Sequence, residues 1–156
     1  MLGKENRLEA RIVSVNISTA KGVKKTPVPE IEVIENYGVK GDAHAGNWHR
    51  QVSMLSTLSI DKARKWGIDV NFGDFAENIT VEGVELWNFP VGTKVLVNDV
   101  ELELTQIGKE CHDSCTIARA VGKCVMPKEG VFLKVVKGGK IKVGDTLIFI
   151  IPKVGF

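Results

Sequence analysis

Short segments of alternating apolar and polar residues, separated by glycine or asparagine turns, recur along this chain and restrict what it can fold into. In the clearest case, residues 94–97 and 100–106 flank Asn98 and Asp99, two residue types that tolerate the positive φ of a type I′ hairpin turn. A period of two is that of a strand with one buried face. The other segments with strand character are 12–18, 30–36, 51–56, 79–81, 131–137, 140–143 and 146–151.

Two of these segments support more detailed predictions. In residues 12–18 the alternation predicts that Val13, Val15 and Ile17 face the core, and that the serines and the asparagine between them face outward. The glycine pair at 138–139 predicts a hairpin between residues 131–137 and 140–143.

Only one segment has clear helical character. Ser56 or Ser59 can cap a helix that runs to about Trp66 and ends at Gly67. A chain of 156 residues fits one domain, residues 1–156. Seven or so short strands with one or two short helices predict a mainly β fold. We expect an antiparallel closed β-barrel, because closure leaves no unpaired sheet edge.

The sequence also excludes some classes of protein. The longest apolar run, residues 147–151, is far too short to span a bilayer, and the first ten residues lack the apolar core of a signal peptide. We therefore expect a cytoplasmic protein without a membrane partner. In that reducing compartment an odd number of cysteines favours metal, redox or sulfur chemistry over a disulfide framework.

The charge is distributed unevenly along the chain. Residues 1–108 carry 12 basic and 15 acidic residues, whereas residues 109–156 carry 9 basic and 4 acidic residues. A basic region suits an anionic ligand such as a phosphate. Nucleic acid is not expected, because the chain has no run of five or more basic residues and no pattern of a nucleic-acid-binding fold.

All three cysteines, Cys111, Cys115 and Cys124, lie in the basic part of the chain. A thiol reacts or binds soft metals as the thiolate, which nearby cations stabilise. The charged or titratable neighbours are Lys109, Glu110, His112, Asp113, Arg119, Lys123 and Lys128. A cysteine that serves only for packing usually lies in an apolar run, so this setting predicts a chemical role for at least one of the three.

Four segments, taken in order, connect the chain with a known family: GVKGDAHAGNWHRQVSML (residues 38–55), GDFAENITVEG (73–83), LELTQIGKEC (102–111) and GGKIKVGD (138–145). They resemble the successive blocks of MOSC domains, the C-terminal domains of molybdenum cofactor sulfurases, which also occur as small stand-alone bacterial proteins. The resemblance covers about residues 10–150. It implies a β-barrel that binds the molybdenum cofactor, an anionic pterin phosphate dithiolene.

The resemblance also implies a cysteine that carries sulfur to the cofactor or ligates molybdenum. The family's cysteine falls on Cys111, the first choice for both roles, while Cys115 and Cys124 stay open as alternatives. The cofactor-binding residues that it implies are Lys40, His44, Arg50, Asn78 and Arg119. A cysteine desulfurase or a molybdoenzyme is the expected protein partner. Whether the protein is itself a sulfur transferase or a component of a molybdenum-dependent oxidoreductase is left open.

Each residue also has a simpler interpretation. Asp42 and His44 can close a turn through bonds between side chain and backbone, and Asn78 can cap one. Arg50 can be a surface charge, although guanidinium suits bidentate phosphate binding. A different class of function is a structural or regulatory zinc site, whose ligands would be Cys111, His112 and Cys115 with Cys124 or His44.

Overall fold

The protein is described by a computed structural model that covers residues 6–21, 23–108 and 129–152. Within these residues the fold is mainly β, as predicted, with one α-helix, α1 (Thr57–Lys65), and one turn of 3-10 helix, η1 (Leu86–Asn88). The strands are β1 (Asn6–Ile17), β2 (Thr26–Val28), β3 (Glu30–Ile34), β4 (Gly38–Val39), β5 (Val52–Ser56), β6 (Ile79–Val81), β7 (Lys94–Val97), β8 (Val100–Ile107), β9 (Val131–Lys137), β10 (Gly139–Lys142) and β11 (Thr146–Ile151).

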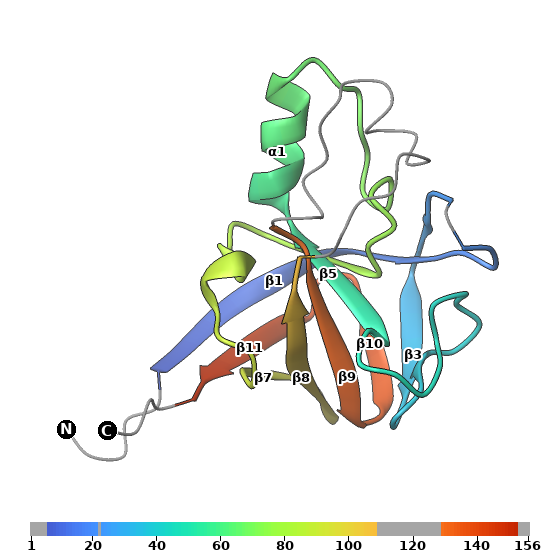
Figure 1. Ribbon diagram of the computed structural model, residues 1–156, viewed down its shortest axis with the longest axis vertical. Helices are drawn as coiled ribbons and strands as arrows, with labels where there is room; N and C mark the ends of the chain where they lie inside the picture. Colours follow the sequence, from blue (N-terminus) through green and yellow to red (C-terminus); the bar gives the residue numbers. More distant parts are fainter. Residues whose placement is uncertain (1–5, 22, 109–128, 153–156) are drawn as a thin grey trace.

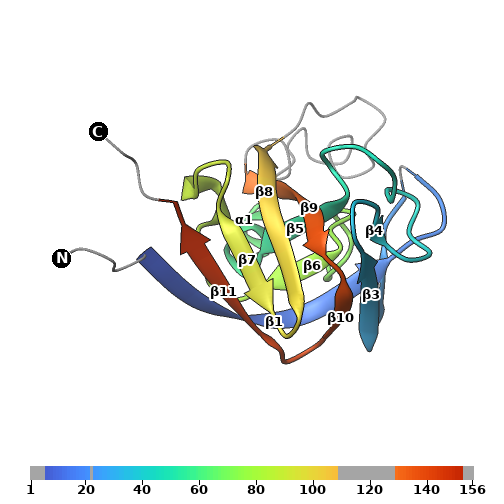
Figure 2. The same ribbon diagram turned by 90° about the horizontal axis from the view of Figure 1, so that it is seen from below.

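Seven of the strands close into a barrel (Figures 1 and 2). Their order is β11-β7-β8-β9-β5-β6-β1, and the pairing of β1 with β11 completes the circle. Strand β2 extends the sheet from the far end of β1. Apolar side chains from these strands fill the barrel, including the fully buried Ile12, Met54, Leu102 and Leu147.

The predicted closed barrel is confirmed, but it is mixed rather than antiparallel throughout. Strands β5 and β6 run parallel, with Met54 opposite Ile79 and Ser56 opposite Val81. Parallel neighbours need a long crossover, and α1 with the loop that follows it supplies one. Figure 1 shows α1 standing at one end of the barrel, where Ile60 and Ala63 pack against Phe132 and Leu55 in a second, smaller core.

The hairpin predicted at the glycine pair 138–139 is also wrong. Strand β10 leaves β9 and pairs with β3, which pairs in turn with β4 in a separate three-stranded sheet. A Cβ atom at Gly138 would lie 2.6 Å from the carbonyl oxygen of Val33. The glycine therefore permits a close approach of two backbones at this position rather than a two-residue turn.

The predicted faces of residues 12–18 need correction as well. The pairing of β1 with β6 shifts register between Ile12 and Ser14, so that Ile12 and Val15 both enter the barrel core. Ser14 and Asn16, expected at the surface, are buried. The irregularity in β1 thus points two polar side chains into the protein, where they need hydrogen-bond partners.

The turns and caps agree in part with the sequence. The side chain of Ser56, one of the two candidates, caps α1 by accepting a hydrogen bond from the Leu58 amide at 3.1 Å. The helix ends before Gly67, which has a φ of +89°. Strands β7 and β8 form the predicted hairpin, but only Asn98 of its two turn residues has a positive φ, of 53°, so the turn is not type I′. None of the helices described is long and apolar enough to span a membrane.

Candidate functional site

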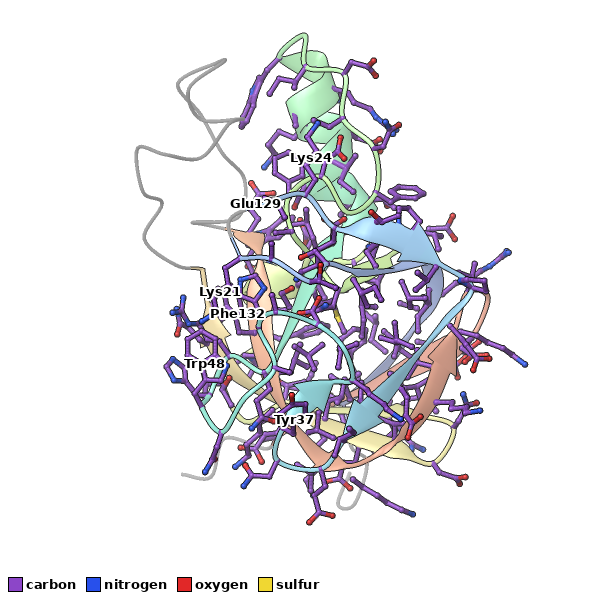
Figure 3. The ribbon with its side chains drawn as sticks, turned by 90° about the vertical axis from the view of Figure 1, so that its right-hand side faces the viewer. Lys21, Lys24, Tyr37, Trp48, Glu129 and Phe132 are labelled. Atoms are coloured by element: carbon purple, nitrogen blue, oxygen red, sulfur yellow. The ribbon has the colours of Figure 1, made fainter. Side chains whose placement is uncertain are left out.

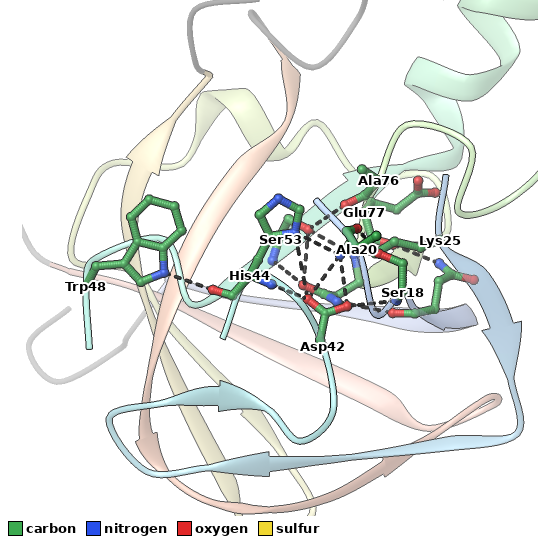
Figure 4. A network of polar contacts seen from close by, with 11 residues as sticks. Ser18, Ala20, Lys25, Asp42, His44, Trp48, Ser53, Ala76 and Glu77 are labelled. Atoms are coloured by element: carbon green, nitrogen blue, oxygen red, sulfur yellow. Dashed lines mark hydrogen bonds and ion pairs between the residues drawn. The ribbon is translucent and has the colours of Figure 1, made fainter. Parts of the chain in front are cut away.

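A fully buried ion pair lies beneath the glycine-rich loop that follows β4. Lys25 Nζ lies 2.8 Å from Oδ1 and 3.0 Å from Oδ2 of Asp42, and neither side chain is exposed (Figure 4). Asp42 Oδ1 also accepts a hydrogen bond from the Ser18 amide at 3.0 Å. Burial alone would raise the pKa of Asp42, but its bonds with His44, Lys25 and Ser18 hold that pKa well below its usual range.

His44 is held at three points, two of them on this pair and one on Trp48. Its backbone amide donates to Asp42 Oδ2 at 3.1 Å, and its carbonyl oxygen accepts from Trp48 Nε1 at 2.9 Å. Its ring nitrogen Nδ1 lies 2.9 Å from Lys25 Nζ. Asp42 therefore does close the turn, as the simpler interpretation held, and in doing so it orients a histidine whose side chain is 26% exposed.

Arg50 lies between two aromatic rings. Its guanidinium carbon is 4.5 Å from the centre of the Trp48 ring and 5.6 Å from the centre of the Phe132 ring. Figure 3 shows Trp48 and Phe132 on the same side of the molecule. Among the residues described, no carboxylate pairs with Arg50, and its buried Nε atom has no hydrogen-bond partner. The arrangement leaves a cation with unused donors at this place.

The loop that carries Arg50 is fastened to the ends of β8 and β9. His49 Nε2 lies 2.6 Å from Gln106 Oε1, and the Gln106 amide donates to the Gly108 carbonyl at 2.7 Å. The hydroxyl of Thr105 donates to the carbonyl oxygens of His49 and Phe132. The part of the chain that carries the cysteines, residues 109–128, therefore joins the described structure beside Arg50.

The two attachment points of that segment are themselves joined. The amide of Gly108 donates to the carbonyl of Gly130 at 2.6 Å. Glu129 then binds helix α1, since one of its carboxylate oxygens accepts from the Ser59 hydroxyl at 2.6 Å and the other pairs with Lys62 at 2.5 Å. The two flanking residues are thus held by polar contacts, Gly108 with Gly130 and Glu129 with α1.

The other residues singled out in the sequence have different surroundings. Lys40 is exposed. Asn78 is fully buried, and its amide is used within the scaffold: Oδ1 accepts from the Ser53 amide at 3.0 Å, and Nδ2 donates to the Asn16 carbonyl at 3.1 Å. Five of the residues singled out in the sequence lie outside the described residues: Cys111, His112, Cys115, Arg119 and Cys124. Of the candidate zinc ligands, only His44 is therefore described. No metal-binding group of three or more His, Cys, Asp or Glu occurs among the residues described.

A second buried polar cluster, formed by Glu77, Asn16 and Thr80, lies next to Asn78. Glu77 is completely buried; its Oε2 accepts from the Gly73 amide at 3.0 Å and from the Thr80 hydroxyl at 2.8 Å, while Oε1 has no partner among the described atoms. Burial raises the pKa of Glu77 to about 7, although these hydrogen bonds oppose the shift. Asn16 joins the cluster, donating to the Glu77 carbonyl at 3.1 Å.

Sequence reasoning missed Lys25, Trp48 and Phe132 as parts of this site. Lys25 stands in a connection between strands, where a lysine is usually a solvated charge. In the sequence, Trp48 is close to Arg50 and Phe132 is close to the cysteine segment. Phe132 stands 82 positions after Arg50, so no local pattern connects the two. Only the pairing of β5 with β9, which sets Ser53 opposite Phe132, brings the two together.

Comparison with known proteins identifies the class. Residues 41–148 match the family model described as MOSC domain, which is more than half of the chain. The protein belongs to the MOSC domain family, as the sequence resemblance indicated, and this family is associated with molybdenum cofactor sulfurases. No match to a curated protein was found.

Solved structures support the fold. The YuaD protein from Bacillus subtilis superposes with a TM-score of 0.80 at 16% identity, over 96% of this chain and 100% of that one. YiiM from Geobacillus stearothermophilus gives 0.68 at 19% identity, over 90% of this chain and 75% of that chain. YiiM from Escherichia coli gives 0.66 at 16% identity, over 96% of this chain and 72% of that chain.

Proposed function

We propose that this protein binds the molybdenum cofactor beside Arg50 and that a cysteine of residues 109–128, with Cys111 as the first choice, carries sulfur to it or ligates molybdenum. The observation that supports this proposal most directly is the state of Arg50. Its guanidinium is held between Trp48 and Phe132, and its buried Nε lacks an acceptor among the described residues.

A buried donor without an acceptor costs free energy, so an unpaired buried donor in a folded protein often indicates a binding site for a ligand. Guanidinium is planar, permanently charged and able to bind two oxygens of a phosphate at once. Trp48 and Phe132 contact the guanidinium but offer it no hydrogen-bond acceptor, so its N–H groups can bind the oxygens of a ligand. Trp48, which is only partly buried, also offers ring surface that suits a flat heterocycle such as a pterin. The donor set therefore fits an anionic pterin phosphate.

The attachment of the cysteine segment supports the second half of the proposal. Gly108 and Glu129 flank residues 109–128, and the contacts of Gln106 and Thr105 with His49 bring the Gly108 side close to the loop that carries Arg50. Four basic residues, Lys109, Arg119, Lys123 and Lys128, share this segment with the cysteines, and a cation close to a thiol favours its thiolate form. Thiolate is a soft ligand that suits both sulfane sulfur and molybdenum.

In the sulfur-carrying form, the Cys111 thiolate attacks the outer sulfur of a persulfide on a donor protein. A new S–S bond forms on Cys111, the S–S bond of the donor breaks, and the donor leaves as a thiolate. A cysteine desulfurase is the class of donor that this step requires. The cofactor, when bound, supplies the metal that receives the sulfur, while Arg50 and its aromatic neighbours hold the anionic end in place.

The test is to purify the protein from a host that makes the cofactor, and to measure bound pterin and intact mass. Arg50→Ala should weaken binding by about 1.5 to 3 kcal/mol, the usual loss for a charged hydrogen bond. Arg11→Ala, which removes an exposed arginine from β1, is the matched control and should not change binding. Equal pterin content in the two variants would remove Arg50 from the site.

The cysteines are tested in the same preparation. An added mass of about 32 Da, one sulfur atom on a thiol, would indicate the persulfide. Cys111→Ser should abolish this adduct or the retention of cofactor, and Cys115→Ser and Cys124→Ser should have smaller effects. Equal effects of all three substitutions would point to a cluster instead, and one bound zinc per chain in place of pterin would support the zinc function.

A further inference from the structure

We infer that His44 presents its Nε2–H as a fixed hydrogen-bond donor to an oxygen or nitrogen acceptor of the ligand, and that Lys25 and Asp42 are the positioning residues that fix it. The inference about the ring stands on the geometry of these three residues. Its extension to the ligand rests on the function proposed above.

The first step concerns the contact between Lys25 and the ring. An ammonium group has only donors, so a distance of 2.9 Å between Lys25 Nζ and His44 Nδ1 requires Nδ1 to be the acceptor. In a neutral imidazole the other nitrogen, Nε2, then carries the proton. The contact with Lys25 therefore selects one tautomer.

The second step concerns Asp42. Its Oδ2 is 3.8 Å from His44 Nδ1, beyond hydrogen-bond distance, so Asp42 does not compete with Lys25 for that nitrogen. Both of its oxygens instead bind the Lys25 ammonium, at 2.8 and 3.0 Å. The carboxylate thus compensates the buried charge of Lys25 and aims it at the ring.

The third step concerns the open side of His44. The side chain is 26% exposed, and Nε2 has no hydrogen bond to any residue in the described part of the chain. The backbone of His44 is held on both sides, by Asp42 and by Trp48, and Trp48 stacks on Arg50. Nε2–H is therefore a firmly held donor without a partner among the described residues, on a residue whose backbone binds the tryptophan that contacts Arg50, and it is suited to a ligand. The bond from Lys25 also polarises the ring and makes Nε2–H a stronger donor.

The ring can be tested without the cofactor. NMR that correlates ring nitrogens with ring protons, at neutral pH, should show His44 as a single tautomer with the proton on Nε2. His49→Gln and His112→Gln identify the other two histidine signals. A proton on Nδ1, or the tautomer mixture of free histidine, would overturn the inference.

The positioning role needs a variant that still folds. Lys25→Met alone strands the Asp42 charge, so the test uses the double variant Lys25→Met with Asp42→Asn, which removes both charges together. The single-tautomer signal of His44 should then be lost while the protein stays folded. If the single-tautomer signal persists in the folded double variant, Lys25 and Asp42 do not determine the tautomer of His44. If the double variant does not fold, the nitrogen shift of His44 Nδ1 in the wild-type protein decides, since the value of an acceptor nitrogen without a hydrogen bond would overturn the contact with Lys25.

The ligand contact is tested by substitutions that differ in donor position. The amide nitrogen of Gln can occupy the place of Nε2, whereas the Asn side chain is too short to reach it. His44→Asn should lower cofactor retention by about tenfold, the loss expected for one hydrogen bond to a charged acceptor. His44→Gln should restore most of it. Equal losses of cofactor retention in both variants would show that His44 has a structural role and donates no hydrogen bond to the ligand.

The source of the acceptor is separated with two probes. Inorganic phosphate and a pterin without phosphate are added in turn, and the Nε2 signal of His44 is followed. A shift with phosphate alone assigns His44 to the phosphate end of the ligand, and a shift with the pterin alone assigns it to the ring. No shift with either probe would remove the ligand contact. If wild-type protein purified from a host that makes the cofactor contains no pterin, the proposed function is refuted. The assignment of the His44 proton to Nε2 would still stand.

Discussion

Lys25 and Asp42 are neighbours in the interior of the protein, with 2.8 Å between Nζ and Oδ1 and no exposed surface on either side chain. They come from separate segments, one just before β2 and the other in the loop after β4. The pair therefore joins two loops that no strand pairing joins directly. His44 links the pair to Trp48, and the Trp48 ring contacts Arg50.

Breaking this pair should be costly. Lys25→Met leaves the Asp42 carboxylate buried without its cation, and we expect the free energy of unfolding to fall by about 3 to 5 kcal/mol. The double variant Lys25→Met with Asp42→Asn should lose much less, because no charge is left uncompensated. Urea unfolding of both variants measures the difference. Equal losses would show that the charges are not what holds these segments together.

The pair should also make the fold sensitive to acid. The pKa of Asp42 is depressed in the folded protein, so its contribution is present above the ordinary value of 3.8 and is lost as pH falls through the lower folded value.

Glu77 predicts the opposite dependence on pH. Its folded pKa is raised from 4.5 to about 7, so between these values the folded protein holds a proton that the unfolded chain has released. Stability should therefore fall as pH rises through this window, by about 3 kcal/mol in total, and change no further above it. Glu77→Gln should remove this slope in urea unfolding at several pH values, whereas Glu82→Gln, at an exposed position, should keep it.

Two glycines with similar backbone angles should respond differently to alanine. Gly41 has a φ of +82° and open space around it, so Gly41→Ala should cost only the strain of the left-handed conformation, about 1 to 2 kcal/mol. Gly73 has a φ of +90°, and its added Cβ would lie 2.3 Å from the carbonyl oxygen of Lys25. Gly73→Ala should cost about 1 to 3 kcal/mol more, measured by urea unfolding. Matching losses would mean that the backbone of Lys25 moves aside freely.

The aromatic ring over Arg50 should matter for ligand binding. Trp48→Leu removes the ring that orients the guanidinium, and we expect cofactor affinity to fall by about tenfold, a loss of about 1.4 kcal/mol. Trp87→Leu is the matched control, since it removes a similar contact with Lys62, at 5.4 Å, on helix α1. A comparable loss of pterin in both variants would indicate a general effect on folding.

The sequence was sufficient for most strand positions because their signal is local. Residues 94–106 alternate around a short turn, and β7 and β8 pair as expected. Pairing over longer distances has no such signal. The segment after Gly138 has the pattern of a hairpin arm, yet β10 pairs with β3, and the glycine serves a close approach to Val33. The parallel pair β5 and β6 could have been suspected from the helix between them.

The site was predictable to the extent that its chemistry lies within one loop. His44 and Arg50 stand close together in the glycine-rich segment, and the structure connects them through Trp48. Lys25 had no local sign, because only folding sets it against Asp42. The irregularity in β1 that buries Asn16 was likewise invisible, since alternation alone assigns that residue to the surface.

The hydrogen bond from Gly108 to Gly130 has a consequence for how this barrel can diversify. Strands β8 and β9 pair from Glu101 opposite Lys137 to Ile107 opposite Val131, and this bond continues their ladder by one step. In general, lengthening a flexible loop costs only about 0.6 kcal/mol for each doubling of its length. A different segment can therefore be grafted at this junction with little loss of stability, while the loop that carries Arg50 stays unchanged.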